Sequence, residues 1–251
     1  MPYIATLPMY DWPKHRAAID ARWAKLRGAL RDGGFDAPDE LTRDGDLQAL
    51  WLSPDLLLGE TCIYPLSTVL AGHVRYVATP VYDVAGCGAG TYRSVIVRRG
   101  AGGGMPPPQT EEPVLPPEAL SGVMAANAPA SMSGFVAVVR DCDALGLTMP
   151  GRDDILWTGS HRDSIDAVAA GRADHAAIDC VTWSIALEYE PAAQGLHVAG
   201  WTASRPGLPL ITSLSMDDDA LARIRRAVLA SMEAVVLDPP VEITRLPDPR
   251  P

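Results

Sequence analysis

The chain has 251 residues, which is enough for one large or two medium domains with a buried core. Its composition, 47% hydrophobic and 21% charged residues, is ordinary for a globular protein. A net charge of −10 argues against nucleic-acid binding, which requires a basic surface. No apolar stretch approaches the ~18–20 residues of a membrane span, so we expect no membrane-spanning segment.

The first residues indicate the cellular compartment, and the spacing of the cysteines indicates whether a metal site is expected. Residues 1–7 have no basic region followed by a long apolar run, so we expect a cytoplasmic protein, or a periplasmic one if a leader has been removed. The four cysteines are scattered without a C-x-x-C pair, which disfavours a zinc site. We expect buried thiols, with a Cys62–Cys87 bridge as the alternative in an exported protein. No metal or cofactor is expected.

Strand-like and helix-like runs alternate along the chain, which predicts an α/β protein. A first strand at residues 3–7 precedes a helix at 13–32, for which Asp11 is the expected N-cap and Gly33 the stop. Four apolar residues line one face of this helix: Ile19, Trp23, Leu26 and Leu30. Three further strands are expected at residues 55–59, 74–79 and 92–99.

Residues 100–117 are rich in glycine and proline and end in an acidic stretch. Such a composition predicts a solvated loop that packs no core. Beyond it, four strands are expected at residues 122–126, 155–158, 176–179 and 196–201, followed by a fifth at 210–212. Helices are expected at residues 133–140, 161–170 and 180–187.

The last helix has a strong start signal. Ser215 is the expected N-cap, and three aspartates at 217–219 fill the first turn, where the helix dipole favours negative charge. Its apolar stripe consists of Leu221, Ile224, Val228 and Met232.

Two segments place hydroxyl residues where helices are expected to begin. They are PASMSG at residues 129–134 and TGSH at residues 158–161. Backbone N–H groups are unpaired at such starts, and the dipole attracts anions. If the two starts converge, Ser131, Ser133 and nearby N–H groups can hold a small oxyanion, and Gly134 lets it approach the backbone. The alternative is that one serine is only an N-cap.

His161 and Asp179 extend this candidate site. A helix start disfavours the imidazolium, so we expect a neutral His161 or one paired with a ligand. Asp179 ends a strand, and its carboxylate can accept the proton of a monoprotonated oxyanion or of an ammonium group. The alternatives are a solvated or capping His161 and an Asp179 that caps the next helix.

Three tyrosines follow the first three strands at the same expected end of the sheet. Tyr10, Tyr64 and Tyr82 are therefore candidate ligand contacts, since ligands of open α/β sheets bind where strands meet loops. The alternative for each is a place in the core.

Seven short motifs occur in an order that resembles a known family. They are LPMYD at 7–11, TCIYPL at 61–66, ATPVYD at 78–83, YRS at 92–94, SMSG at 131–134, TGSH at 158–161 and AID at 177–179. Together they resemble the phosphate/phosphite/phosphonate substrate-binding proteins of ABC transporters. The resemblance implies a two-lobe type 2 periplasmic-binding-protein fold with mixed sheets, a double-crossover hinge and a Venus-flytrap cleft between the lobes.

The resemblance also assigns lobes and roles. Lobe 1 is expected at residues 1–90 plus 200–251, and lobe 2 at 91–199. Ser131, Ser133, His161 and Asp179 match the family's oxyanion-binding positions, and Tyr64 and Tyr82 match its tyrosines. Met132 falls where relatives commonly have a hydroxyl residue, so phosphate, phosphite and phosphonate all remain open as ligands. An ABC permease is the implied partner.

Other function classes remain as alternatives. A cytoplasmic biosynthetic enzyme on the same fold would act on a phosphorylated or carboxylated metabolite. A ligand-sensing protein would report ligand binding to a partner. A hydrolase would combine a serine at 131 or 133 with His161 and Asp179, but the chain has no Gly-x-Ser-x-Gly elbow.

Overall fold

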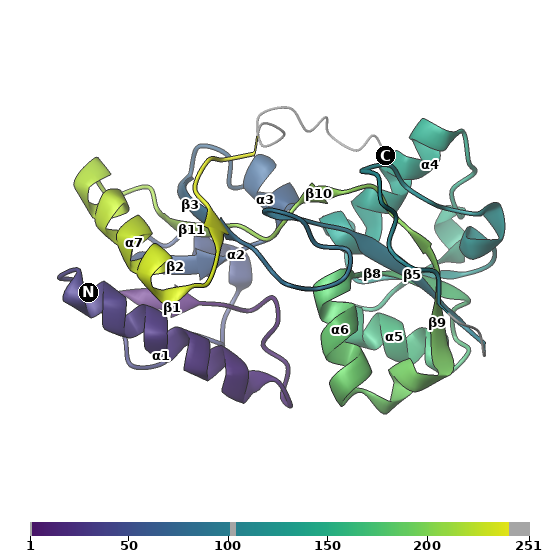
Figure 1. Ribbon diagram of the computed structural model, residues 1–251, viewed down its shortest axis with the longest axis horizontal. Coiled ribbons are helices and arrows are strands. Elements are labelled where there is room, and N and C mark those ends of the chain that lie inside the picture. Colours follow the sequence, from purple (N-terminus) through teal and green to yellow (C-terminus); the bar gives the residue numbers. More distant parts are fainter. Residues whose placement is uncertain (1, 101–103, 241–251) are drawn as a thin grey trace. The chain divides into compact units, whose positions relative to one another are not determined.

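The computed structural model describes residues 2–100 and 104–240 (Figure 1). The chain forms two compact units: unit 1 within residues 1–82 and 206–251, and unit 2 at residues 83–205. It passes into unit 2 after Tyr82 and returns after Arg205. The sequence interpretation set the limits of the second lobe at 91 and 199 instead. The expected α/β class is confirmed.

Unit 1 is built on a mixed sheet. Its strand order is β1 (Ile4–Thr6), β2 (Leu56–Glu60), β11 (Leu210–Ser213), β3 (Val74–Pro80) and β12 (Val235–Val236). β1 and β2 are parallel, whereas β11 runs antiparallel to both β2 and β3. Because β11 enters only after the chain has returned from unit 2, the sheet joins segments that are far apart in the sequence.

The described residues of unit 1 form the helices α1 (Arg16–Asp32), α2 (Leu47–Trp51), α3 (Ile63–Ser67) and α7 (Asp218–Ser231). α1 and α7 lie side by side (Figure 1). The expected stripe of α1 is buried, and so are Leu221, Ile224 and Val228 of α7, while Met232 lies past the end of its helix. The two five-residue helices α2 and α3 were not predicted, because one turn is too short for a periodic pattern.

Two expected helix starts are wrong. α1 begins at Arg16, and the Asp11 carboxylate instead accepts a hydrogen bond from Nε of Arg43 at 2.6 Å. α7 is capped by Asp217, whose Oδ1 accepts from the backbone N–H of Ala220 at 2.7 Å. The predicted cap, Ser215, lies outside the helix and donates to the Pro54 carbonyl. Adjacent capping residues compete for one position, and only the path of the loop decides between them.

Unit 2 contains a second mixed sheet. Its order is β7 (Ile155–Trp157), β6 (Met124–Ala126), β8 (His175–Asp179), β5 (Ser94–Arg99) and β9 (Leu196–Trp201). β6 is parallel to β7 and β8, whereas β5 is antiparallel to β8 and β9. The short strands β4 (Thr91–Tyr92) and β10 (Arg205–Pro206) lie next to the crossings. The expected strand at 92–99 is therefore broken at Arg93.

Helices of unit 2 cover both faces of this sheet (Figure 1). They are α4 (Ala137–Leu145), α5 (His161–Ala169) and α6 (Cys180–Tyr189), with short helical turns at Pro117–Leu120, Met132–Val136, Arg152–Asp154 and Pro191–Gly195. Val138 and Cys142 of α4 pack against Ile96, Met124 and Ala126 of the strands. Since side chains alternate along a strand, the neighbours of Ile96 and Ala126 turn to the other face, toward α5.

The glycine- and proline-rich stretch differs from the expectation of a solvated loop. Residues 101–103 lie outside the described residues, but Leu115 is 6% exposed and packs in the cluster of Ile96 and Val138. Val114 forms a β-bridge with Trp201 of β9. The N–H of Met105 also donates to the Val198 carbonyl of β9 at 2.8 Å. The composition of the stretch did not indicate these contacts, because many of them are made by the backbone.

Candidate anion-binding site

The first hydroxyl segment lies between β6 and α4. Ser131 caps the helical turn Met132–Val136, and its Oγ accepts from the backbone N–H of Gly134 at 3.1 Å. The alternative that one serine is a cap therefore holds for Ser131. The side chain of Met132 is 1% exposed, and that of Ser133 is 5% exposed.

Only glycine fits at position 134, because two neighbouring side chains occupy the space that a Cβ atom would need. A Cβ atom at this position would lie 1.8 Å from Oδ1 of Asn127 and 3.1 Å from Cε1 of His161. Oδ1 of Asn127 is buried and accepts no hydrogen bond within the described residues. The sequence analysis did not identify Asn127 as a candidate. Asn127 directly follows β6, and such strand ends are where other candidates, such as Asp179, were found.

The second hydroxyl segment places His161 beside the first. Ser160 caps α5 through its Oγ, which accepts from the backbone N–H of Asp163, and His161 is the first residue of the helix. The backbone N–H of Gly159 donates to the Asn127 carbonyl at 3.0 Å, which ties the two segments together. As a result, Ser133 Oγ lies 2.9 Å from His161 Nε2. The two predicted helix starts do converge.

Asp179 uses its two oxygens differently. Oδ1 accepts from the backbone N–H of Thr182 at 2.8 Å and so caps α6, as the alternative reading expected. Oδ2 lies 3.5 Å from Nε2 of His161. Burial lowers the pKa of His161 below 6.5, although Asp179 and the Ala177 carbonyl partly oppose this shift. His161 is therefore neutral at pH 7.

The arrangement differs from a hydrolytic triad. In such a triad the serine contacts one ring nitrogen of histidine and the carboxylate contacts the other. Here Ser133 and Asp179 both approach Nε2 of His161. The carboxylate thus cannot orient the ring for proton abstraction from the serine, and the three side chains are better suited to surround a bound group.

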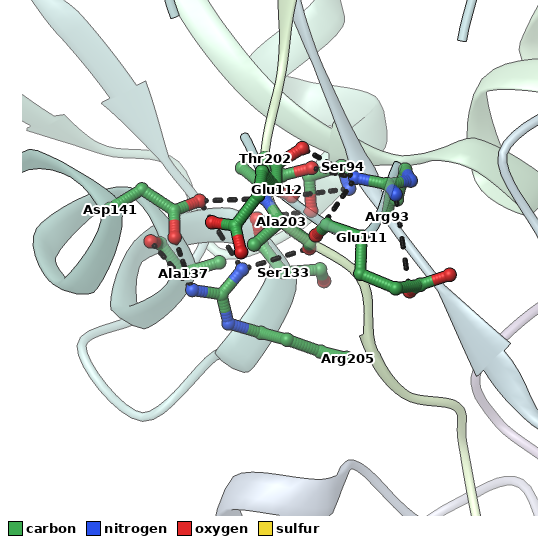
Figure 2. A network of polar contacts seen from close by, with 10 residues as sticks. All are labelled: Arg93, Ser94, Glu111, Glu112, Ser133, Ala137, Asp141, Thr202, Ala203 and Arg205. Atoms are coloured by element: carbon green, nitrogen blue, oxygen red, sulfur yellow. Dashed lines mark hydrogen bonds and ion pairs between the residues drawn. The ribbon is translucent and has the colours of Figure 1, made fainter. Parts of the chain in front are cut away.

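A buried polar network holds the segment in place (Figure 2). Ser94 Oγ donates to the Ser133 carbonyl at 2.8 Å, and its N–H donates to Thr202 Oγ1 at 2.8 Å. The neighbouring Arg93 guanidinium donates to the carbonyls of Glu112 and Thr202. These bonds connect the start of β5 to Thr202, which follows β9, and to the helical turn that carries Ser133.

Asp141 and Arg205 form the other half of this network (Figure 2). Asp141 on α4 is 3% exposed and pairs with the Arg205 guanidinium, and its Oδ2 also accepts from the Ala203 N–H at 2.9 Å. None of the sequence motifs indicated this pair, because its members are separated by 64 positions.

The predicted tyrosines belong to unit 1. The rings of Tyr10 and Tyr82 pack edge to face with centroids 5.5 Å apart, and Tyr10 is buried. Arg22 donates to the Tyr82 hydroxyl at 3.0 Å and to Glu60 at 3.3 Å. Tyr64 is buried on α3.

Arg22 and Glu60 were missed by the sequence analysis. Glu60 ends β2 as Asp179 ends β8, which was an available signal. Burial by itself would lower the pKa of Arg22, but Tyr82 and Glu60 outweigh it and raise that pKa, so the guanidinium stays charged.

Within residues 2–100 and 104–240, no group of three or more His, Cys, Asp or Glu side chains is placed to hold a metal ion. Over the same ranges, no helix is long and apolar enough to cross a bilayer.

Known structures share this fold at low sequence identity. PhnD1 from Prochlorococcus marinus, in complex with methylphosphonate, has a TM-score of 0.67 at 13% identity, covering 90% of this chain and 84% of its own. A binding-protein component of an ABC phosphonate transporter from Pseudomonas aeruginosa has a TM-score of 0.61 at 16% identity, covering 94% and 82%. XAC2383 from Xanthomonas citri, bound to chloride, has a TM-score of 0.64 at 14% identity, covering 94% and 92%. These neighbours confirm the type 2 periplasmic-binding-protein fold.

Sequence comparison identifies the family. No curated protein gives a significant match. Residues 61–239, most of the chain, match the family described as "ABC transporter, phosphonate, periplasmic substrate-binding protein". The matched range includes both hydroxyl segments, Asp179, Tyr64 and Tyr82. The chain therefore belongs to the phosphonate substrate-binding protein family of ABC transporters.

Proposed function

We propose that unit 2 binds the oxyanion group of a phosphonate, phosphite or phosphate at Ser133, His161 and Asp179. The observation that carries this proposal is the 2.9 Å approach of Ser133 Oγ to His161 Nε2 at the start of two helical segments. The Ser133 hydroxyl can rotate from the imidazole to an incoming oxyanion. Family membership supports solute binding rather than catalysis as the task of this site.

Asp179 supports a ligand that carries one proton. Its Oδ2 lies beside His161, whereas Oδ1 is committed to the α6 cap. A phosphonate monoanion can donate its O–H to this oxygen, but a sulfate dianion has no proton to donate and meets only charge repulsion. We therefore place alkylphosphonates, phosphite and phosphate in the ligand class and exclude sulfate from it.

Replacing Ser133 with alanine is expected to weaken methylphosphonate binding roughly 10- to 100-fold, since a hydrogen bond to a charged group contributes about 1.5–3 kcal/mol. Isothermal titration calorimetry of the full chain measures the effect. The control is Ser121→Ala, because Ser121 is exposed in the same unit and donates only to the Glu118 carbonyl. Equal affinities of the Ser133→Ala variant and the wild type would contradict the proposed site.

Replacing Asp179 with asparagine is expected to change selectivity more than affinity. Asparagine can still cap α6, but it removes the charge that repels a fully ionised ligand. We expect the affinity of sulfate relative to methylphosphonate to rise by about 10-fold or more. The measurement is a competition titration with the two anions, run with phosphite as a second proton-bearing ligand. An unchanged ratio of the two affinities would show that Asp179 does not distinguish protonated from fully ionised ligands.

The family also suggests the protein's setting. Its description is of periplasmic proteins that serve ABC transporters, so we propose that this chain acts in the periplasm and delivers its ligand to an ABC permease. Co-purification with an ABC permease from the cells that produce this chain, dependent on methylphosphonate, tests this proposal. Ligand binding without any such association would leave the site intact and overturn the transport role.

A further inference from the structure

Two cysteine thiols meet beside the candidate site in unit 2. Sγ of Cys87 lies 3.4 Å from Sγ of Cys180, although 93 positions separate them in the sequence. Cys180 is the first residue of α6 and directly follows Asp179, and it is 2% exposed. Cys87 lies in the loop that follows the first crossing and is partly exposed.

The backbone holds the two cysteines together. Gly86, next to Cys87, comes so close to the start of α6 that a Cβ at this position would lie 3.2 Å from Cβ of Cys180 and 2.5 Å from the Trp201 ring. Gly86 also has a positive φ of 96°, which side chains disfavour. The N–H of Cys180 donates to the Arg93 carbonyl at 2.9 Å. The backbone contacts of Gly86 and Cys180 therefore hold the two thiols near each other.

We propose that Cys87 and Cys180 are a redox pair that forms a reversible disulfide when the protein meets a thiol-oxidising disulfide. In a disulfide the sulfurs are about 2.05 Å apart, so the two atoms have to approach by about 1.4 Å. Rotation of the Cys87 side chain in its glycine-rich loop can provide this. The pair is not the Cys62–Cys87 bridge considered from the sequence, since Cys62 belongs to unit 1 and Cys87 to unit 2.

The exchange starts at the more accessible thiol. The Cys87 thiolate attacks one sulfur of an external disulfide such as oxidised glutathione, and the first glutathione thiolate leaves. The Cys180 thiol then attacks Sγ of Cys87, and its proton passes to the departing second glutathione, which leaves as a thiol. Two protein thiols are oxidised to one disulfide, and one glutathione disulfide is reduced to two thiols.

The bond would fasten the loop after the first crossing to the helix start that carries Asp179. This adds a property that the proposed anion binding does not require. Cys142 is suited to serve as the control. Cys142 is 1% exposed inside the cluster under α4, and no other described cysteine belongs to that cluster, so it has no thiol partner there.

The test treats the folded full chain with oxidised glutathione, then unfolds it, alkylates the remaining thiols and measures the intact mass. We expect the number of alkylated thiols to fall from four to two, and peptide mapping to find the Cys87–Cys180 link. The oxidised protein should melt roughly 5 °C higher than the reduced one, because the bond closes a long loop. A reducing agent should reverse both changes.

Three variants complete the experiment. Cys142→Ser should still lose two thiols on oxidation and show the same rise in Tm, whereas Cys87→Ser should lose none and show no rise. Cys180→Ala should behave like Cys87→Ser, and because the mapping is done on the wild type, a poorly folding variant does not decide the outcome. Four remaining thiols, a link to Cys62 or a glutathione that stays attached to Cys87 in the folded wild type would overturn the proposal.

Discussion

Replacing Asp141 with alanine is expected to lower the free energy of unfolding by about 3 kcal/mol, the low end of the cost of breaking a buried ion pair from one side. The Arg205 side chain is 11% exposed, so its charge would remain largely buried without its partner. The N–H of Ala203 would also lose its acceptor at 2.9 Å. Urea denaturation at pH 7, followed by fluorescence, measures the loss.

The matched control for this change is Asp143→Ala, because Asp143 is exposed on the same helix, α4. We expect that variant to stay within about 0.5 kcal/mol of the wild type. The double variant Asp141→Ala, Arg205→Ala should be more stable than the two single losses predict when they are added, since removing both charges leaves none unpaired. If Asp141→Ala lowered the free energy of unfolding by less than about 1 kcal/mol, water would have to solvate the unpaired Arg205 charge, and the prediction would be wrong.

The second large effect is expected from pH. His175 in β8 is 0% exposed, and burial, with a further contribution from Arg98, lowers its pKa from 6.5 to about 4. The folded protein therefore binds this proton less readily than the unfolded chain. Stability from His175 is complete above pH 6.5 and is lost as the pH falls toward 4, by about 2 kcal/mol at pH 5.

The stability of the wild type also changes with pH because carboxylates titrate. The contribution of His175 is therefore measured by comparing variants. His175→Gln should lose stability at pH 7 from altered packing but should lose about 2 kcal/mol less than the wild type between pH 7 and pH 5. The control His73→Gln, at an exposed position in unit 1, should follow the wild type across this range. Parallel stability curves for His175→Gln and the wild type would show that His175 titrates normally.

The chain's periodic patterns were reliable where burial follows regular spacing. The α1 stripe at Ile19, Trp23, Leu26 and Leu30 is buried as expected, because one face of an amphipathic helix has to leave water. The strands on either side of the hydroxyl segments also formed where the apolar runs indicated, including β8 up to Asp179. The family resemblance depended on the same positions and is confirmed.

Local sequence patterns could not predict contacts between residues that are far apart in the chain. Nothing near Asp141 in the sequence indicates its partner Arg205, which another element brings to it. Arg22 reaches Glu60 across 38 positions for the same reason. The cap of α7 at Asp217 was also missed, because several polar residues near a helix start can serve as the cap and the path of the loop decides which one does.

The sequence by itself determined the α/β class and the two helix starts with Ser131, Ser133 and His161, because each depends on residue types at short spacing. It also determined the family, through the order of short motifs along the chain. Only the tertiary structure decided that Ser131 is a cap while Ser133 reaches His161, that both Ser133 and Asp179 approach the same ring nitrogen, and that Cys87 meets Cys180. These outcomes depend on how β5, β6 and β8 are ordered in one sheet. Strand pairing between distant segments sets that order, and no local pattern specifies it.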